Sequence, residues 1–158
     1  MLRVGGESIH NSLYGFITKV EVLEAELVAL AGDKHYDEVR AEIHAHGKAT
    51  GARLLAERGE KADKLDTLYR YIADAHLEGM PCDPGAQVEP ANGTLRYTHI
   101  QCNHIPNWKY TSCPVSRMCA LHNEWLQGFI AGLDGSVTYA VEKTIADGAS
   151  SCAAVIAL

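Results

Sequence analysis

The stretch Glu78–Gly93 divides the chain into two halves with different sequence patterns. It holds three prolines and three glycines, a composition that breaks regular helices and strands and predicts a long loop. Long loops in compact domains are often lids or binding loops, so we expect this one to be a mobile lid beside a pocket. Helical patterns precede it and strand patterns dominate after it, which favours an α+β fold over alternating βαβ units.

The first half predicts three helices, over Leu13–Leu30, Asp37–Arg58 and Lys61–His76. The second has the weakest apolar stripe, and the small residues Gly47 and Gly51 in it predict close packing against a neighbour. The first has a clear apolar stripe, typical of an amphipathic helix. Its members are Leu13, Phe16, Ile17, Val20, Leu23, Leu27 and Leu30.

The second half predicts strands at Thr94–Cys102, Ser136–Ala146 and Ser151–Leu158, and a helix from Pro114 to Gly132. The turn residues Asp147–Gly148 predict that the last two strands pair as an antiparallel hairpin. We therefore expect one α+β domain over 1–158, with a helical part (1–78), a loop (79–93) and a strand-helix-hairpin part (94–158). The N-terminal helices should pack on a small, mostly antiparallel sheet, with one further helix from the C-terminal half.

Composition narrows the class of protein. The chain is 47% hydrophobic and 22% charged, which is typical of globular proteins. A net charge of −6 without a basic run argues against nucleic-acid binding. Neither a signal peptide nor an apolar stretch of bilayer length is evident, so the sequence predicts a cytoplasmic protein that does not bind membranes. The five cysteines include no CxxC pair, and in a reducing compartment they are not expected to form disulfides.

Cys119 and His122 lie one helical turn apart on the inward stripe of the helix that follows Pro114. An imidazole in contact with a thiol lowers the thiol pKa and produces a nucleophilic thiolate. Free cysteine is also among the most buried residue types, and a histidine in such a stripe can simply bond a backbone carbonyl. The pair is either a reacting pair or part of the core.

Other candidate residues surround this pair in the sequence. Cys102 ends a strand, where scaffolds tend to present reactive groups, although it also fits an ordinary strand end. Glu142 shares a strand face with small and polar residues, a face that lines a pocket or meets solvent. Cys152 stands among small apolar residues, as a core cysteine or a site residue.

Zinc accepts Cys, His and Glu ligands, and the second half offers Cys102, Cys119, Glu142 and Cys152. Their spacing matches no compact zinc motif. The sequence therefore requires no cofactor and leaves zinc open.

The segments "LRYTHIQC", "MCALHNEW" and "VEKTIADGASSC", within residues 94–158, resemble the L-2-amino-thiazoline-4-carboxylic acid hydrolase family. The resemblance implies hydrolysis of a C–N or C=N bond in a small cyclic or amidine-like acid, opening a thiazoline ring toward a cysteine derivative. Family members often have an acidic residue soon after the helical cysteine, and in this chain the substitute would be either His122 or Asn123. The recurring family positions correspond here to Cys102, Cys119, Glu142, Thr144, Gly148 and Cys152.

More distantly, the same half resembles the 4-vinyl reductase domain, a small-molecule-binding module with zinc-binding versions. Thr144 stands where those versions have a further cysteine. This resemblance implies the alternative function, a non-catalytic binding module, with or without structural zinc.

Our first hypothesis is a hydrolase with a small-molecule substrate and thiol-based catalysis. Cys119 or Cys102 would be the nucleophile, His122 the base, and Glu142 the group that polarises a charged nitrogen. We expect at least three of Cys102, Cys119, His122, Glu142 and Cys152 to line one pocket. The sequence leaves a homo-oligomer open, as well as a purely structural role for the cysteines. The expected substrate contacts are His104, Trp108, Tyr110, Asn123, Thr144 and Cys152.

Overall fold

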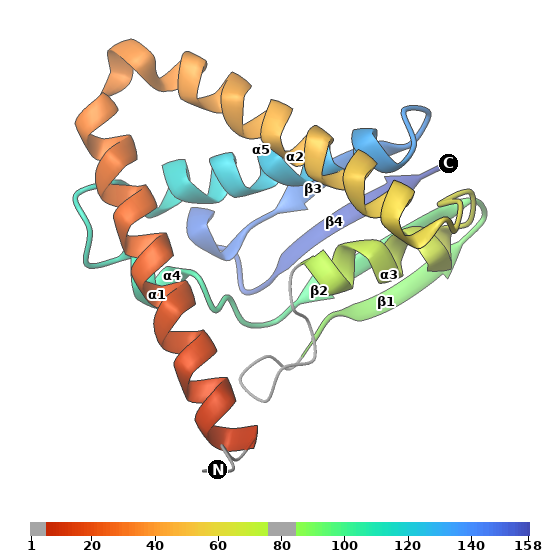
Figure 1. Cartoon of the computed structure of the whole chain (residues 1–158), viewed down its shortest axis with the longest axis horizontal. Coiled ribbons are helices and arrows are strands. Elements are labelled where there is room, and N and C mark those ends of the chain that lie inside the picture. Colours follow the sequence, from red (N-terminus) through yellow and green to blue (C-terminus); the bar gives the residue numbers. More distant parts are fainter. Residues whose placement is uncertain (1–5, 76–84) are drawn as a thin grey trace.

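The computed structural model describes residues 6–75 and 85–158 and has the expected α+β fold. Three helices, α1 (Gly6–Ala31), α2 (Tyr36–Arg58) and α3 (Leu65–Ala75), precede the sheet (Figure 1). The strands are β1 (Gln87–Ala91), β2 (Thr94–His99), β3 (Thr138–Lys143) and β4 (Cys152–Ala157). A short helix, α4 (Ile105–Trp108), and the long helix α5 (Val115–Leu133) lie between β2 and β3. No helix within the described residues is long and apolar enough to cross a membrane.

The sheet is antiparallel throughout, in the order β1-β2-β4-β3. The hairpin of β3 and β4 predicted from the sequence is confirmed, joined through the 3-10 turn Ile145–Asp147. Residues from α3 and α5 pack on the sheet face that carries Leu95, Tyr97, Ala154 and Ile156, and together they form the main core. This packing leaves the opposite sheet face, with Arg96 and Glu142, outside the core.

Helices α2 and α5 run side by side in the same direction (Figure 1) and touch through glycines. A methyl group at Gly47, Gly51, Gly128 or Gly132 would lie 2.1–2.2 Å from a carbonyl oxygen of the opposite helix. Real Cβ atoms are not found that close to backbone, so only glycine permits this separation. The expectation of close packing at Gly47 and Gly51 is confirmed.

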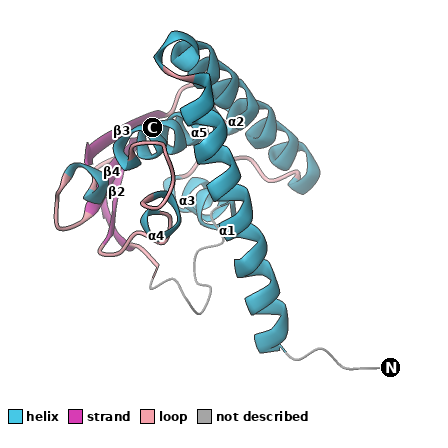
Figure 2. Cartoon of the chain, turned by 90° about the vertical axis from the view of Figure 1, so that its left-hand side faces the viewer, coloured by secondary structure: helices cyan, strands magenta, loops and turns pink. Residues whose placement is uncertain are grey.

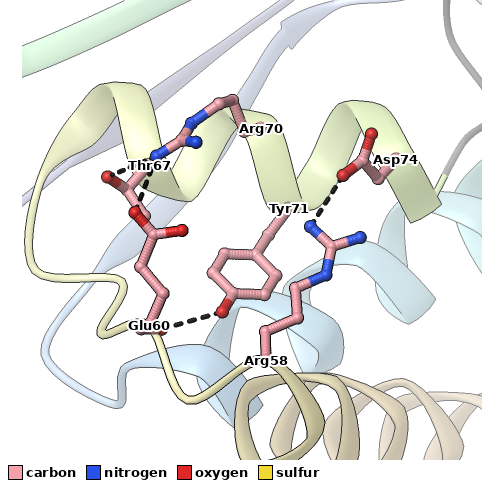
Figure 3. A network of polar contacts seen from close by, with 6 residues as sticks. All are labelled: Arg58, Glu60, Thr67, Arg70, Tyr71 and Asp74. Atoms are coloured by element: carbon pink, nitrogen blue, oxygen red, sulfur yellow. Dashed lines mark hydrogen bonds and ion pairs between the residues drawn. The ribbon is translucent and has the colours of Figure 1, made fainter.

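Polar contacts anchor α3 to the segment that follows α2, as Figure 3 shows. Arg58 Nη1 lies 2.7 Å from Asp74 Oδ2, and the Arg58 guanidinium stands 5.0 Å above the Tyr71 ring. The Tyr71 hydroxyl donates to the carbonyl of Glu60 at 2.8 Å, while Arg70 pairs with the Glu60 carboxylate at 2.8 Å. These bonds orient α3 so that Tyr71 enters the core.

Helix α1 extends away from the sheet at its N-terminal end (Figure 2). Its second half packs on α4 and α5 through Glu21, Ala25 and Val28. The apolar stripe seen in the sequence does not make this contact, because Phe16, Leu23, Leu27 and Leu30 are 63% to 82% exposed.

The expected loop 79–93 is wrong at its C-terminal end, where Gln87–Ala91 forms the edge strand β1. Asn92 and Gly93 both have positive φ, 43° and 80°, and close a two-residue hairpin to β2. Asn-Gly is the preferred sequence for such a turn, and Pro90 is tolerated because β1 is an edge strand. Of the rest of the proposed lid, residues 79–84 lie outside the described residues, and residues 85 and 86 lead into β1.

Candidate functional site

A cavity of about 110 Å³ lies where the inner face of the sheet meets α5 and the segment that follows β2. Four of the five residues expected to converge, Cys102, Cys119, His122 and Cys152, line it. The expectation that at least three would share one pocket is confirmed. Of the expected substrate contacts, His104, Trp108, Asn123 and Thr144 also line the cavity.

Cys119 reaches the cavity from α5 as a half-buried thiol. Burial raises its pKa to about 11, and a hydrogen bond with the Thr144 side chain acts in the opposite direction. The Asn123 amide nitrogen lies 3.5 Å from the sulfur and donates to the Cys119 carbonyl at 2.8 Å. The expectation that Cys119 is an activated thiolate does not agree with this environment.

The other two thiols accept hydrogen bonds from the backbone. The amide of Ile145 donates to the Cys152 sulfur at 3.3 Å. Burial raises the pKa of Cys102, and the backbone amides of Ile105 and His104 lower it by bonding the sulfur. These amide bonds offset part of the effect of burial, and the pKa of Cys102 stays above its ordinary value.

A carboxylate-imidazole pair lies beside Cys102. His104 Nδ1 is 2.6 Å from Glu21 Oε1, and Asn107 Nδ2 donates to Glu21 Oε2 at 2.5 Å. The His104 ring stacks on Trp108 with ring centroids 5.1 Å apart, and the centroid of the His122 ring lies 4.5 Å from that of His104. With Nδ1 bonded to the carboxylate, the ring orientation is fixed and Nε2 is the nitrogen left to exchange protons.

Glu21 is the functional candidate that sequence reasoning missed. It comes from α1, more than 80 positions before His104, and only 8% of its surface is exposed. The available indication was its position on one helix face with the small residue Ala25 and with Val28, away from the leucines. A lone acidic residue on such a face indicates a buried polar partner.

Two tyrosines extend the polar wall of the cavity. The Tyr97 hydroxyl donates to the Tyr139 hydroxyl at 3.2 Å, and Tyr139 donates to Asn123 Oδ1 at 2.9 Å. Burial raises the pKa of Tyr139 to about 12, so it stays a neutral donor. The bond from Tyr139 fixes the orientation of the Asn123 amide and directs its nitrogen toward Cys119.

The charge of the lining favours neutral or anionic ligands. Among the described residues that line the cavity there is no Asp or Glu, whereas Lys143 and three histidines are present. The carboxylate of a bound ligand would form an ion pair with Lys143, and no carboxylate of the described lining would repel it.

Two expected site residues lie elsewhere. Glu142 is wrong as a cavity residue. It is the extra residue where the register of β3 shifts between Val141 and Lys143, and Arg96 Nε bonds its carboxylate at 2.8 Å on the outer sheet face. Tyr110 is 82% exposed, with Lys109 Nζ 4.7 Å from its ring centroid, and it does not line the cavity.

The proposed zinc ligands do not form a metal site. Glu142 points away from the three cysteines, and across 6–75 and 85–158 no group of three or more His, Cys, Asp or Glu is placed to hold a metal ion. The donor set therefore does not fit zinc.

Comparison with known proteins gives no assignment, because no family model matches the chain and no curated protein shows a significant match to it.

Proposed function

We propose that the protein is a small-molecule hydrolase that cleaves a C–N bond of a compact organic acid in the cavity, with Cys102 as nucleophile. The observation that carries the proposal is the Glu21–His104 pair beside Cys102. Cys102 and His104 line the cavity, whereas Glu21 does not, and the described lining contains no carboxylate. A thiol, an imidazole and a carboxylate that orients the imidazole are the parts of a nucleophilic site. Thiazoline-carboxylate ring opening, implied by the resemblance of 94–158, is the first reaction to test.

Size and charge support a small acid as substrate. A cavity of roughly 150 Å³ accommodates benzene, and the present one, at about 110 Å³, suits a five-membered ring. Lys143 would bind the carboxylate, and the phenol and amide groups of Tyr139 and Asn123 would bond ring heteroatoms.

The proposed chemistry adds water across the C–N bond in two steps. The Cys102 sulfur bonds to the carbon while its proton passes to His104 Nε2, and the C–N bond breaks as His104 returns that proton to the departing nitrogen. Water then attacks the carbon held by sulfur, His104 takes the water proton, and Cys102 leaves as the thiol when that proton is returned. Glu21 is a positioning residue, since it acts through His104.

A second candidate, a non-catalytic binding module, is favoured by a separate observation. Burial raises the pKa of both Cys102 and Cys119, which keeps the two thiols protonated at neutral pH unless a ligand changes their surroundings. A cavity lined by neutral thiols, phenols and an amide binds a ligand without reacting with it.

The two candidates are separated by measuring turnover and binding of 2-amino-thiazoline-4-carboxylate in parallel. Mass spectrometry follows ring opening, and calorimetry follows binding. We expect Cys102→Ser to abolish turnover while it still binds the acid, and Glu21→Gln to lower kcat more than it raises KM and to shift the pH profile. Cys119→Ser should keep most of the turnover.

Cys113→Ser is the matched control, because it makes the same exchange at a buried thiol outside the cavity. Binding without turnover in the unaltered protein would support the binding module and refute the hydrolase. If the acid neither binds nor reacts, this substrate class is refuted. Full turnover by Cys102→Ser would refute its role as nucleophile.

A further inference from the structure

Helix α1 exposes its most apolar face. Glu21, Ala25 and Val28 pack against the rest of the protein, and successive residues of a helix turn by about 100°. That turn places Leu23, Leu27 and Leu30 on the side opposite the packed face. An amphipathic helix normally buries such a stripe, so this arrangement indicates a missing partner.

The spacing of the stripe indicates what kind of partner it has. The separations along the stripe are 3, 4, 3, 4 and 3 residues, the a/d pattern of a coiled coil. The stripe comprises Leu13, Phe16, Val20, Leu23, Leu27 and Leu30. A seam of this kind fits another helix with the same pattern, and this chain contains one in every copy.

We propose that the protein forms a homodimer through α1, with the helices of two copies packed antiparallel along this stripe. In that register Leu13 faces Leu30 of the second copy, Phe16 faces Leu27, and Val20 faces Leu23. Each apolar residue meets another, and the two-fold axis passes between Val20 and Leu23. The interface is isologous, so it closes as a dimer and does not propagate.

Charge complementarity supports the second copy as the occupant. Lys19 and Glu26 lie seven residues apart on the same edge of the stripe. In the antiparallel register Lys19 of each copy lies opposite Glu26 of the other, which gives two ion pairs that flank the seam. The Glu26 side chain is held at this edge because its Oε1 accepts from the amide of Ser112 at 3.0 Å.

The shape of the protomer is compatible with this pairing. The first half of α1 extends beyond the rest of the protein (Figure 2), whereas the second half packs on the body with its other face. Antiparallel pairing lays the extended half of each helix along the packed half of the other. The two bodies then lie at opposite ends of the helix pair.

The test measures the mass of the full chain in solution by sedimentation equilibrium. We expect twice the 17.2 kDa of one chain at micromolar concentration. Leu23→Glu with Leu27→Glu should weaken the dimer by on the order of a hundredfold or more, because it buries charges in the seam. Ala45→Glu with Ala49→Glu is the matched control: it adds the same charges to exposed positions of α2 and should leave the dimer intact.

A charge exchange tests the antiparallel register without altering the apolar seam. Lys19→Glu and Glu26→Lys each create two like-charge contacts in a homodimer, whereas a mixture restores both attractive pairs in a heterodimer. We expect each variant alone to dimerise less tightly than the mixture. A mixture without preferential heterodimers overturns the register.

A monomeric native chain overturns the whole proposal. So does a monomer that sediments with anionic lipid vesicles only when Leu23 and Leu27 are intact, which would assign the stripe to a membrane surface. The seam lies on the side of α1 opposite Glu21, so the dimer test does not depend on the proposed function. If the protein shows no turnover, the dimer proposal is unaffected.

Discussion

Adding one methyl group at Gly47 should destabilise the protein, although alanine favours helices. The new Cβ would lie 2.2 Å from the Trp125 carbonyl oxygen and 3.0 Å from the Phe129 amide nitrogen. Both atoms belong to the backbone of α5, so no side-chain rotation relieves the overlap. Helices α2 and α5 must move apart along the glycine contact, which also loosens the packing at Gly51 and Gly128.

Two opposing effects set how much Gly47→Ala changes the free energy of unfolding. Overpacking of this kind typically costs about 1–3 kcal/mol, and replacing a helical glycine by alanine recovers about 0.8–1 kcal/mol. Because the backbone cannot yield locally, we expect a net loss of about 1–2 kcal/mol in the free energy of unfolding. For a chain of this size that loss lowers Tm by about 2–8 °C.

The assay is thermal unfolding followed by circular dichroism at one fixed protein concentration, since any self-association also shifts Tm. Gly15→Ala is the matched control, because Gly15 lies in α1 with nothing within 4 Å of its would-be Cβ. The control should raise the free energy of unfolding by about 0.5–1 kcal/mol. A rise in Tm for Gly47→Ala equal to that of the control would refute the glycine contact between α2 and α5.

Two further predictions concern the cavity and the sheet. The free energy of unfolding should fall as pH rises from 9 toward 12. Burial raises the pKa of Cys119 from 9.0 to about 11 and that of Tyr139 from 10.0 to about 12, so the folded chain retains protons that the unfolded chain loses. Urea midpoints that stay level across this pH window would contradict the prediction. Glu142→Gln should leave ligand binding and turnover unchanged. It should change the free energy of unfolding by less than about 1 kcal/mol, since the ion pair of Glu142 with Arg96 is exposed. A tenfold loss of turnover would show that Glu142 acts on the substrate.

Most of the fold follows from local patterns. The long helices α1, α2, α3 and α5 and three of the strands have sequence patterns long enough to be recognised, whereas the four-residue helix α4 does not. The turn at Asp147–Gly148 predicts the pairing of β3 with β4. The strand β1 is short, contains Pro90, and is exposed along its length, so it lacks the alternation that marks a strand. Its one local sign is the Asn92–Gly93 pair, which specifies a tight hairpin more strongly than the surrounding prolines specify a loop.

The site is less predictable because its parts come from distant segments. Cys119 and His122 are neighbours in sequence. The predicted strand through Cys102 is too long, because β2 ends at His99 and Cys102 lies in the segment that follows it. Cys102 and Cys152, the first residue of β4, meet the α5 pair in the cavity. The Tyr139–Asn123 bond depends instead on the register of β3 against α5, which no local pattern encodes. The pKa of a thiol depends on its burial in the assembled cavity, which helical spacing does not reveal. The spacing of Cys119 and His122 alone therefore suggested a thiolate, whereas burial raises the pKa of Cys119.

The two faces of α1 explain why its sequence contradicts its packing. If α1 served only to cover the protein, its leucines would face inward, and Glu21 would be an unfavourable residue to bury. The inward face instead carries the carboxylate that bonds His104 and Asn107, and the small residue Ala25 beside Val28 lets the helix approach closely enough for those bonds. The apolar stripe is then available for a second copy, whose packing would hold the helix and thus the position of Glu21. One helix in this way connects the proposed catalytic pair with the proposed dimer.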